Sequence, residues 1–240
     1  PLLKTTAALS VVVAIGFSIA ENRSVPQGHE YATQVGGHEI LKLDDGSQIE
    51  LNTDTLLRTN MTSHTRTVWL DNGEAYFQVR HDPTRPFVVF AAGHRITDIG
   101  TNFRVRSEAK RIEVALIEGR VRFESTATGV QRHSALMTSG DLVVATSDSM
   151  SVTRMPMQQL ANQLGWRNGL LVFKHTTLED AVNEFNRYNR EKLLIADPVV
   201  ARLTIYGTFR TSNLHQFIEV AQAVFGLRVE TRGNTTVISR

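Results

Sequence analysis

Eight histidines are the side chains of this chain best suited to bind a metal or transfer a proton. No two of them have the i, i+3 or i, i+4 spacing that places two ligands on one helix face. The sequence has no cysteine, which excludes disulfides, thiolate zinc sites and a thiol nucleophile. The histidines are His29, His38, His64, His81, His94, His133, His175 and His215. Neither a metal nor another cofactor is expected.

The other residue types used in catalysis also have simpler structural interpretations. Asp44, Asp45 and Glu74 are of a type common at β-hairpins, so a role in turns is favoured over an acid–base pair. Trp69 and Trp166 are interpreted as core aromatics rather than sugar-binding platforms. No G-x-S-x-G motif, Walker loop or dinucleotide fingerprint is present. The residues therefore predict a protein without an enzyme active site.

Composition indicates a folded protein with enough apolar side chains for one large or two modest domains, and the length favours two. The chain has 240 residues, of which 41% are hydrophobic and 21% charged. Its 26 basic and 24 acidic residues give a net charge of +2. Nucleic-acid binding requires clustered basic residues, so no nucleic-acid partner is expected.

An uncharged segment lies near the start of the chain, between Lys4 and Glu21. Its sixteen residues are more than a signal-peptide core requires and slightly fewer than the roughly 20 of a membrane-spanning helix. We expect residues 1–21 to form all or part of a transmembrane anchor. A cleaved signal peptide ending at Ser18-Ile19-Ala20 and a buried soluble helix remain alternatives.

The flanking charges and the first residue bear on the anchor's orientation. Lys4 precedes the segment and Glu21 follows it, so the positive-inside tendency places the amino end in the cytoplasm and the remaining chain outside it. The chain starts at Pro1 rather than at a methionine, which predicts that further residues precede it in the natural protein.

Short runs of alternating apolar and polar residues extend from about Tyr31 to Ser151, within a predicted domain of residues 22–156. Turn signals separate them at Asp44–Ser47, Asp71–Gly73 and Glu118–Gly119. This pattern predicts an antiparallel all-β domain, either a sandwich or a solenoid-like stack.

The pattern changes to helical spacing in residues 157–240. Thr177 and Asp180 form a capping-box signal before an amphipathic helix, and a second helix follows Ser212 and stops at Gly226. Short strands flank both helices, so a small α+β domain of order βαβ-βαβ is expected. Ten basic and seven acidic side chains give this part a charge of about +3.

The β-rich part also contains specific short sequence motifs in a fixed order. These are Tyr31–Gly36, Leu43–Ser47, Leu51-Asn52, Arg66–Val68, Gly73–Val79, Arg85–Val89, Gly100–Phe103 and Glu118–Val121. Together they resemble the FecR family of transmembrane sigma-factor regulators. The resemblance continues through Trp166, Gly169 and Phe185–Tyr188. One departure is a small local insertion at Gly36–Glu39.

This resemblance implies a single-pass protein of the bacterial inner membrane with its bulk in the periplasm. Its tail resembles the short secretin-and-TonB N-terminal (STN) module. The implied partners are the N-terminal signalling domain of an outer-membrane TonB-dependent transducer that carries a siderophore, periplasmic and intramembrane proteases, and an extracytoplasmic-function (ECF) sigma factor. The family's cytoplasmic anti-sigma helices are absent from this chain, so the fragment alone is not expected to bind the sigma factor.

The resemblance also directs attention to Gly100-Thr101, because several similar regulators cleave themselves at a Gly-Thr pair. The Thr101 hydroxyl would attack the Gly100 carbonyl, and Asp98 or His94 are the nearby candidates for a base. A tight bend before the strand at Phe103 explains the same two residues without chemistry.

Two other functions remain open. One is a periplasmic envelope scaffold or polysaccharide-binding protein that uses the β-domain for adhesion. The other is a hydrolase.

Overall fold

The computed structural model of the protein describes residues 28–98, 100–126 and 133–240. The anchor expected at residues 1–21 lies outside these ranges. Within them, no helix has both the length and the apolar character needed to cross a membrane.

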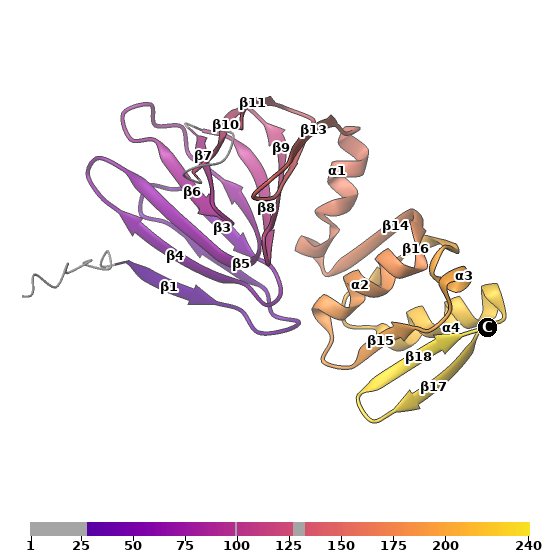
Figure 1. Ribbon diagram of the computed structural model, residues 1–240. Helices are drawn as coiled ribbons and strands as arrows, with labels where there is room; N and C mark the ends of the chain where they lie inside the picture. The colour runs from indigo at the N-terminus through magenta and orange to yellow at the C-terminus, as the bar shows by residue number, and fades with distance from the viewer. Residues whose placement is uncertain (1–27, 99, 127–132) are drawn as a thin grey trace, which may run out of the picture.

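Thirteen strands form one large sheet that folds into two layers and comes close to a barrel (Figure 1). In chain order they are β1 (His29–Ala32), β2 (Glu39–Lys42), β3 (Gln48–Leu51), β4 (Leu56–Met61), β5 (Arg66–Gln78), β6 (Phe87–Ala91), β7 (His94–Asp98), β8 (Asn102–Glu108), β9 (Arg111–Glu118), β10 (Arg120–Ser125), β11 (Ser134–Thr138), β12 (Asp141–Ala145) and β13 (Met150–Arg154). One layer has the order β1-β4-β5-β6-β7-β10-β11, and the other has the order β2-β3-β5-β8-β9-β12-β13. The predicted β-rich fold is therefore present.

The long strand β5 belongs to both layers and runs through Asp71–Gly73, so the prediction of a turn at these residues is wrong. The start of β5 pairs with β4 and β6, while its end pairs with β3 and β8. Asn72 lies at a register shift opposite Leu56, and Gly73 has φ +92°. A Cβ atom on Gly73 would lie 2.3 Å from the Thr55 hydroxyl, so the glycine permits a bend inside a continuous strand.

The antiparallel prediction fails at one pair, because β5 and β6 run parallel. The chain leaves β5 in the second layer and must return to the start of the same strand. Arg66, which is 1% exposed, fixes this return segment. Its guanidinium donates to the carbonyls of Arg85 at 2.8 Å and Arg80 at 2.9 Å, and to the Asp45 carboxylate at 2.7 Å.

Residues 157–240 contain four α-helices, one 3-10 helix and five strands. They are α1 (Met157–Gln163), η1 (Gly165–Asn168), β14 (Leu170–Thr177), α2 (Leu178–Tyr188), β15 (Lys192–Ile195), α3 (Pro198–Ala201), β16 (Thr204–Arg210), α4 (Leu214–Phe225), β17 (Arg228–Arg232) and β18 (Thr235–Ser239). The Thr177 hydroxyl accepts a hydrogen bond from the Asp180 N–H, which caps α2, and Gly226 ends α4 with φ +63°. Strands β14 and β16 pair with each other, while β15, β18 and β17 form a second sheet.

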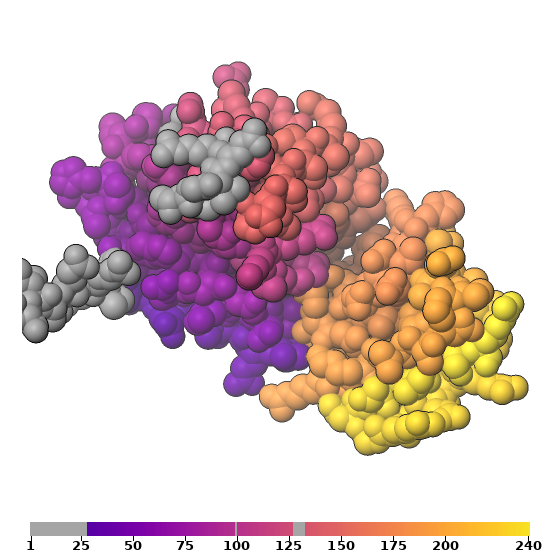
Figure 2. Space-filling model, viewed as in Figure 1, coloured from indigo at the N-terminus to yellow at the C-terminus, as the bar shows by residue number. Residues whose placement is uncertain are grey.

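Each of the two regions has its own hydrophobic core. The first core lies between the two layers of the large sheet, and the second surrounds α2 and α4. Tyr76 of β5 belongs to the second core, so the sheet contributes to the packing of residues 157–240. Figure 2 shows this C-terminal region packed against one end of the β-sheet region. The seam between the two regions contains most of the buried charge described below.

Candidate functional site

The Gly100-Thr101 pair belongs to the short connection between the end of β7 at Asp98 and the start of β8 at Asn102. Thr101 is 4% exposed, and its carbonyl accepts a hydrogen bond from the Val79 N–H at 2.9 Å. The Gly100 N–H donates to Oδ1 of Asp98 at 2.9 Å. The Thr101 Oγ1 atom is buried and has no hydrogen-bond partner among the described residues. No hydrogen bond to a described residue therefore engages this hydroxyl.

Two glycines make the close packing around this bond possible. Gly100 has φ +149°, and a Cβ atom there would lie 2.6 Å from the Cα of His81. A Cβ atom on Gly119 would lie 2.4 Å from the Thr101 methyl group. Neither position accepts a side chain without displacement, so Gly100 permits the close approach of His81 and Gly119 leaves room for the Thr101 methyl group.

The structure separates the two candidate bases. Asp98 lies at the site, whereas His94 lies at the far end of β7. The His94 ring stacks on Phe123 at 5.0 Å, and burial lowers the pKa of its imidazole. His81, which packs against Gly100, was not a sequence candidate, because it is on the return segment before β6 and nothing in the sequence pattern connects it to Gly100.

A second cluster of functional side chains lies at the seam between the two regions, centred on Glu74 of β5. Glu74 is 1% exposed. Its Oε2 atom accepts from Arg187 of α2 at 2.8 Å and from Asn52 at 3.1 Å, while Arg104 of β8 approaches Oε1 at 3.4 Å. The Asn52 amide also donates to the Tyr188 hydroxyl at 2.8 Å. One buried carboxylate therefore joins two strands of the sheet to the last turn of α2.

The charged side chains at this seam shift the pKa values of Glu74 and Arg187. Burial alone would raise the pKa of Glu74, but the attraction of Arg187 and Arg104 outweighs it and lowers the pKa to about 2. Arg187 is also within 3.0 Å of Glu108 and 2.6 Å of Glu184, and these carboxylates help raise its pKa despite its burial. Glu74 and Arg187 are therefore both charged at neutral pH.

A second ion pair secures the other side of the seam. Arg167 of η1 donates from Nε to Glu50 of β3 at 2.9 Å, and its guanidinium carbon lies 3.9 Å from the centre of the Tyr76 ring. His38 approaches the same carboxylate at 3.7 Å and meets the Trp166 ring edge-on. His38 belongs to the local insertion at Gly36–Glu39, so this departure from the family pattern contacts the C-terminal region.

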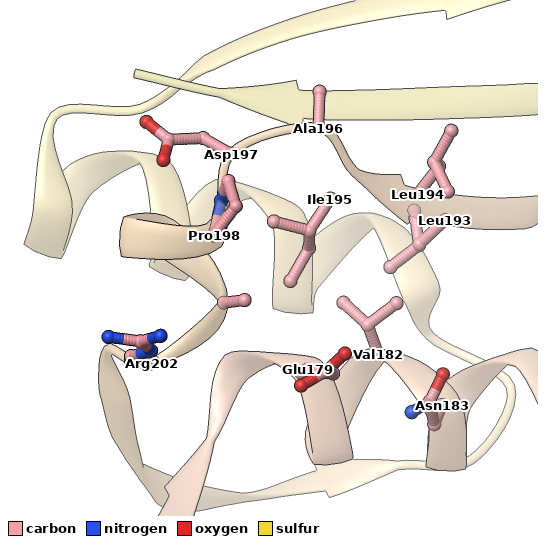
Figure 3. A pocket seen from close by; sticks show the side chains of 11 residues that line it. Glu179, Val182, Asn183, Leu193, Leu194, Ile195, Ala196, Asp197, Pro198 and Arg202 are labelled. Carbon is pink, nitrogen blue, oxygen red and sulfur yellow. The ribbon is translucent and has the colours of Figure 1, made fainter.

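A surface groove of about 350 Å³ lies between α2, β15 and α3 (Figure 3). Val182 and Ile195 line its floor, and Asp197 and Arg202 lie at one end. The groove contains no catalytic arrangement. Among the described residues, no group of three or more histidines, aspartates and glutamates could hold a metal ion.

A match to a family model decides the identity of the region that contains Gly100, Thr101 and Glu74. Residues 29–122 match the model of the FecR protein family. The chain carries a FecR domain. The matched range extends from β1 into β10 and includes every β-sheet residue of the two clusters described above. A comparison with curated proteins finds no match.

Two solved structures share the fold of nearly the whole described chain. Both are crystal structures of a "putative anti-sigma factor" from Parabacteroides distasonis ATCC 8503, determined at 2.50 and 1.65 Å resolution, and each is 22% identical to this chain with a TM-score of 0.72. The first aligns over 89% of this chain and 99% of its own length, and the second over 88% and 98%. The fold of the β-sheet region followed by the C-terminal region is therefore similar to that of those two structures.

Proposed function

We propose that this chain is the extracytoplasmic, signal-receiving part of an inner-membrane regulator of an ECF sigma factor. The FecR domain carries the proposal, and the fold shared with the Parabacteroides distasonis proteins supports it. In this proposal residues 1–21 anchor the chain in the membrane, and the remaining residues lie in the periplasm. The signal reaches the sigma factor when proteases release a cytoplasmic portion that precedes this sequence.

The proposed partner is the N-terminal signalling domain of an outer-membrane TonB-dependent transducer for a siderophore. Residues 157–240 offer it the open edge of a sheet, at β17, which pairs only with β18 among the described strands. The opposite edge, β15, is less accessible. There the Asn186 side chain accepts from the Leu193 N–H at 2.7 Å and donates to its carbonyl at 2.9 Å, which occupies the backbone position a partner strand would use.

Calorimetry with the signalling domain encoded beside this gene tests the partner proposal. Binding to the full chain and loss of binding on deletion of residues 158–240 are expected. Unchanged affinity after the deletion would contradict a role for this region.

Alkaline carbonate extraction of membranes tests the anchor, since release of the full-length protein into the supernatant would favour a cleaved signal peptide instead.

We also propose that the chain cleaves its own Gly100-Thr101 bond in a single turnover. The Thr101 hydroxyl attacks the Gly100 carbonyl carbon through a five-membered ring, the C–N bond breaks, and the hydroxyl proton passes to the freed amine. Water then hydrolyses the ester to give a carboxylate on Gly100 and a free amino terminus on Thr101. The buried hydroxyl and the fixed Gly100 N–H support this proposal.

A second candidate function, polysaccharide binding, has one observation in its favour. On the outer face of the FecR domain the half-buried rings of Trp69 and Phe90 stack with their centres 6.1 Å apart. Arg58 lies over the Trp69 ring, and Arg95 is the cross-strand neighbour of Phe90. Such a flat aromatic surface suits the apolar face of a sugar ring. Retention on a peptidoglycan column that disappears in Trp69→Ala would support this function, and equal retention of both proteins would exclude this face.

A further inference from the structure

A cleft at the seam contains polar atoms that the two regions leave without partners. It has a volume of about 210 Å³ and lies between β8 and β9 of the FecR domain and α1, η1 and β14 of the C-terminal region. A second hollow of about 570 Å³ shares Arg106, Glu113, Asp180 and Glu184 with it. The two hollows therefore form one continuous groove along the seam.

Three side chains at the closed end of this groove carry buried polar atoms with no hydrogen-bond partner among the described residues. They are Nε of Arg104, Nε1 of Trp166 and Oε1 of Gln163. Arg104 is 4% exposed and Trp166 is 5% exposed. Native proteins seldom leave such groups unpaired, since an unsatisfied buried donor or acceptor is costly. The cluster consequently provides two N–H donors and one carbonyl acceptor for a group that is not part of the described chain.

The wall of the cleft provides a further feature, the outer edge of β14. Leu170 and Val172 line the cleft, and β14 pairs with β16 only on its other side. The Thr211 N–H donates to the Gly169 carbonyl, so the alternation of an antiparallel ladder directs the backbone groups of Leu170 and Val172 away from β16. Gly165 of η1 covers the Leu170 carbonyl, to which a Cβ atom on Gly165 would lie only 2.8 Å away, so the free edge begins at Val172. The cleft thus combines a strand edge with the two donors and one acceptor.

We propose that this cleft binds an extended polypeptide segment of a partner protein. A peptide backbone offers carbonyls to Arg104 and Trp166 and an N–H to Gln163, and it extends along the edge of β14. The three polar atoms are shielded from solvent in the structure, so the segment enters with a small widening of the seam. The mixed charges of Arg106, Glu113 and Glu184 at the open end suit a segment without a strong charge of its own. This inference goes beyond the sigma-factor proposal and is tested independently of it.

The two tryptophans of the chain permit a direct test, because Trp166 lines the cleft and Trp69 lies on the outer face of the FecR domain. The full chain, labelled with ¹⁵N-tryptophan in a non-ionic detergent, is titrated with the capped tetrapeptide acetyl-Thr-Val-Thr-Val-amide. Trp69→Phe assigns the two indole N–H signals. We expect a saturable shift of the Trp166 signal and an unmoved Trp69 signal.

Two control ligands and two variants make the result specific. A mixture of acetyl-threonine amide and acetyl-valine amide, and an N-acetylglucosamine tetramer, are expected to leave the Trp166 signal in place. Gln163→Leu is expected to weaken peptide binding roughly three- to tenfold, as for one lost hydrogen bond. Gln159→Leu, at an exposed position of the same helix α1, is expected to bind like the wild type. An unmoved Trp166 signal, an equal response to either control ligand, or equal affinity of the two variants would overturn the proposal.

Discussion

Thr101 is held by neighbours that come from three separate segments of the chain. Asp98 fixes the Gly100 N–H, His81 lies against Gly100, and Gly119 leaves room for the Thr101 methyl group. If the Thr101 hydroxyl attacks the preceding carbonyl, the purified protein should separate with time into two fragments that meet at Gly100 and Thr101. Intact-mass spectrometry is the measurement.

The variants distinguish this chemistry from contaminating proteolysis. Thr101→Ala should remain a single chain, because it lacks the nucleophile, while Thr101→Ser retains a hydroxyl and should still be cleaved. A wild-type chain that stays intact after long incubation would leave Gly100-Thr101 as a tight bend only.

Glu74 should make the free energy of unfolding depend on pH in the acidic range. Its pKa is about 2 in the folded protein against a usual value of 4.5, so its contribution is complete above about pH 4.5 and is lost as the pH falls toward 2. Glu74→Gln should lower the free energy of unfolding at pH 7 by about 3–5 kcal/mol, because Arg187 and Arg104 lose a buried partner.

Urea unfolding at a series of pH values measures this effect. The difference between wild type and Glu74→Gln should shrink below pH 4.5. Glu108→Gln is the matched control, since Glu108 contacts the same Arg187 but its side chain is 46% exposed, and its loss should cost only about 0–1 kcal/mol. Equal losses in the two variants would show that burial at the seam is not what makes Glu74 important.

At the scale of elements, local sequence patterns predicted much of the C-terminal region. Helix α2 begins at the capping threonine Thr177, and α4 ends at Gly226, because both signals act within one turn of the helix. The turn predicted at Asp71–Gly73 was wrong because long-range pairing, not a local signal, decides the structure there. Such residues are compatible with either a turn or a bend inside a strand, and the pairing of β5 with both layers selects the bend.

The open edge of β17 leads to a prediction about partner binding. The two-residue loop between β17 and β18 makes Arg232 and Thr235 a hydrogen-bonded pair, so the Thr231 N–H points to the free edge. Thr231→Pro removes that donor and no backbone hydrogen bond to β18. It also removes the hydrogen bond between the Thr231 and Thr236 hydroxyls, which Thr231→Val removes as well. If a partner strand adds to this edge, the substitution should weaken binding of the transducer signalling domain at least about tenfold in calorimetry, given the loss of one backbone hydrogen bond and the steric block.

The control for this edge retains the N–H group. Thr231→Val keeps the donor and a similar shape, so its affinity should match that of the wild type. If Thr231→Pro binds as well as Thr231→Val, the partner uses another surface of the protein.

At the scale of the whole molecule, the seam explains why certain sequence motifs are spaced so far apart. Asn52, Glu74 and Tyr76 occur in motifs of the FecR domain, and Arg187 and Tyr188 occur in the Phe185–Tyr188 motif. Sequence reasoning linked these motifs only through a family resemblance. Their physical contact could not be predicted, because about 110 residues separate Glu74 from Arg187 and no periodicity extends over that interval.

The buried charges at the seam should also make the two cores unfold together. Arg187 joins Glu74 and Glu108 of the sheet to α2, and separating the regions would expose the Tyr76 ring and leave Glu74 without its shortest ion pair. The wild type should therefore show one thermal transition, whether it is followed by Trp69 in a Trp166→Phe background or by Trp166 in a Trp69→Phe background.

Arg187→Leu should split this single transition into two. The C-terminal region, followed by Trp166, should melt first, because it loses the ion pairs that secure it to the sheet, while Trp69 should report a later transition. Arg190→Leu removes an exposed arginine just beyond the end of the same helix and should leave the two signals coincident. Coincident signals in Arg187→Leu as well would show that apolar packing around Tyr76, rather than the buried charges, couples the two regions.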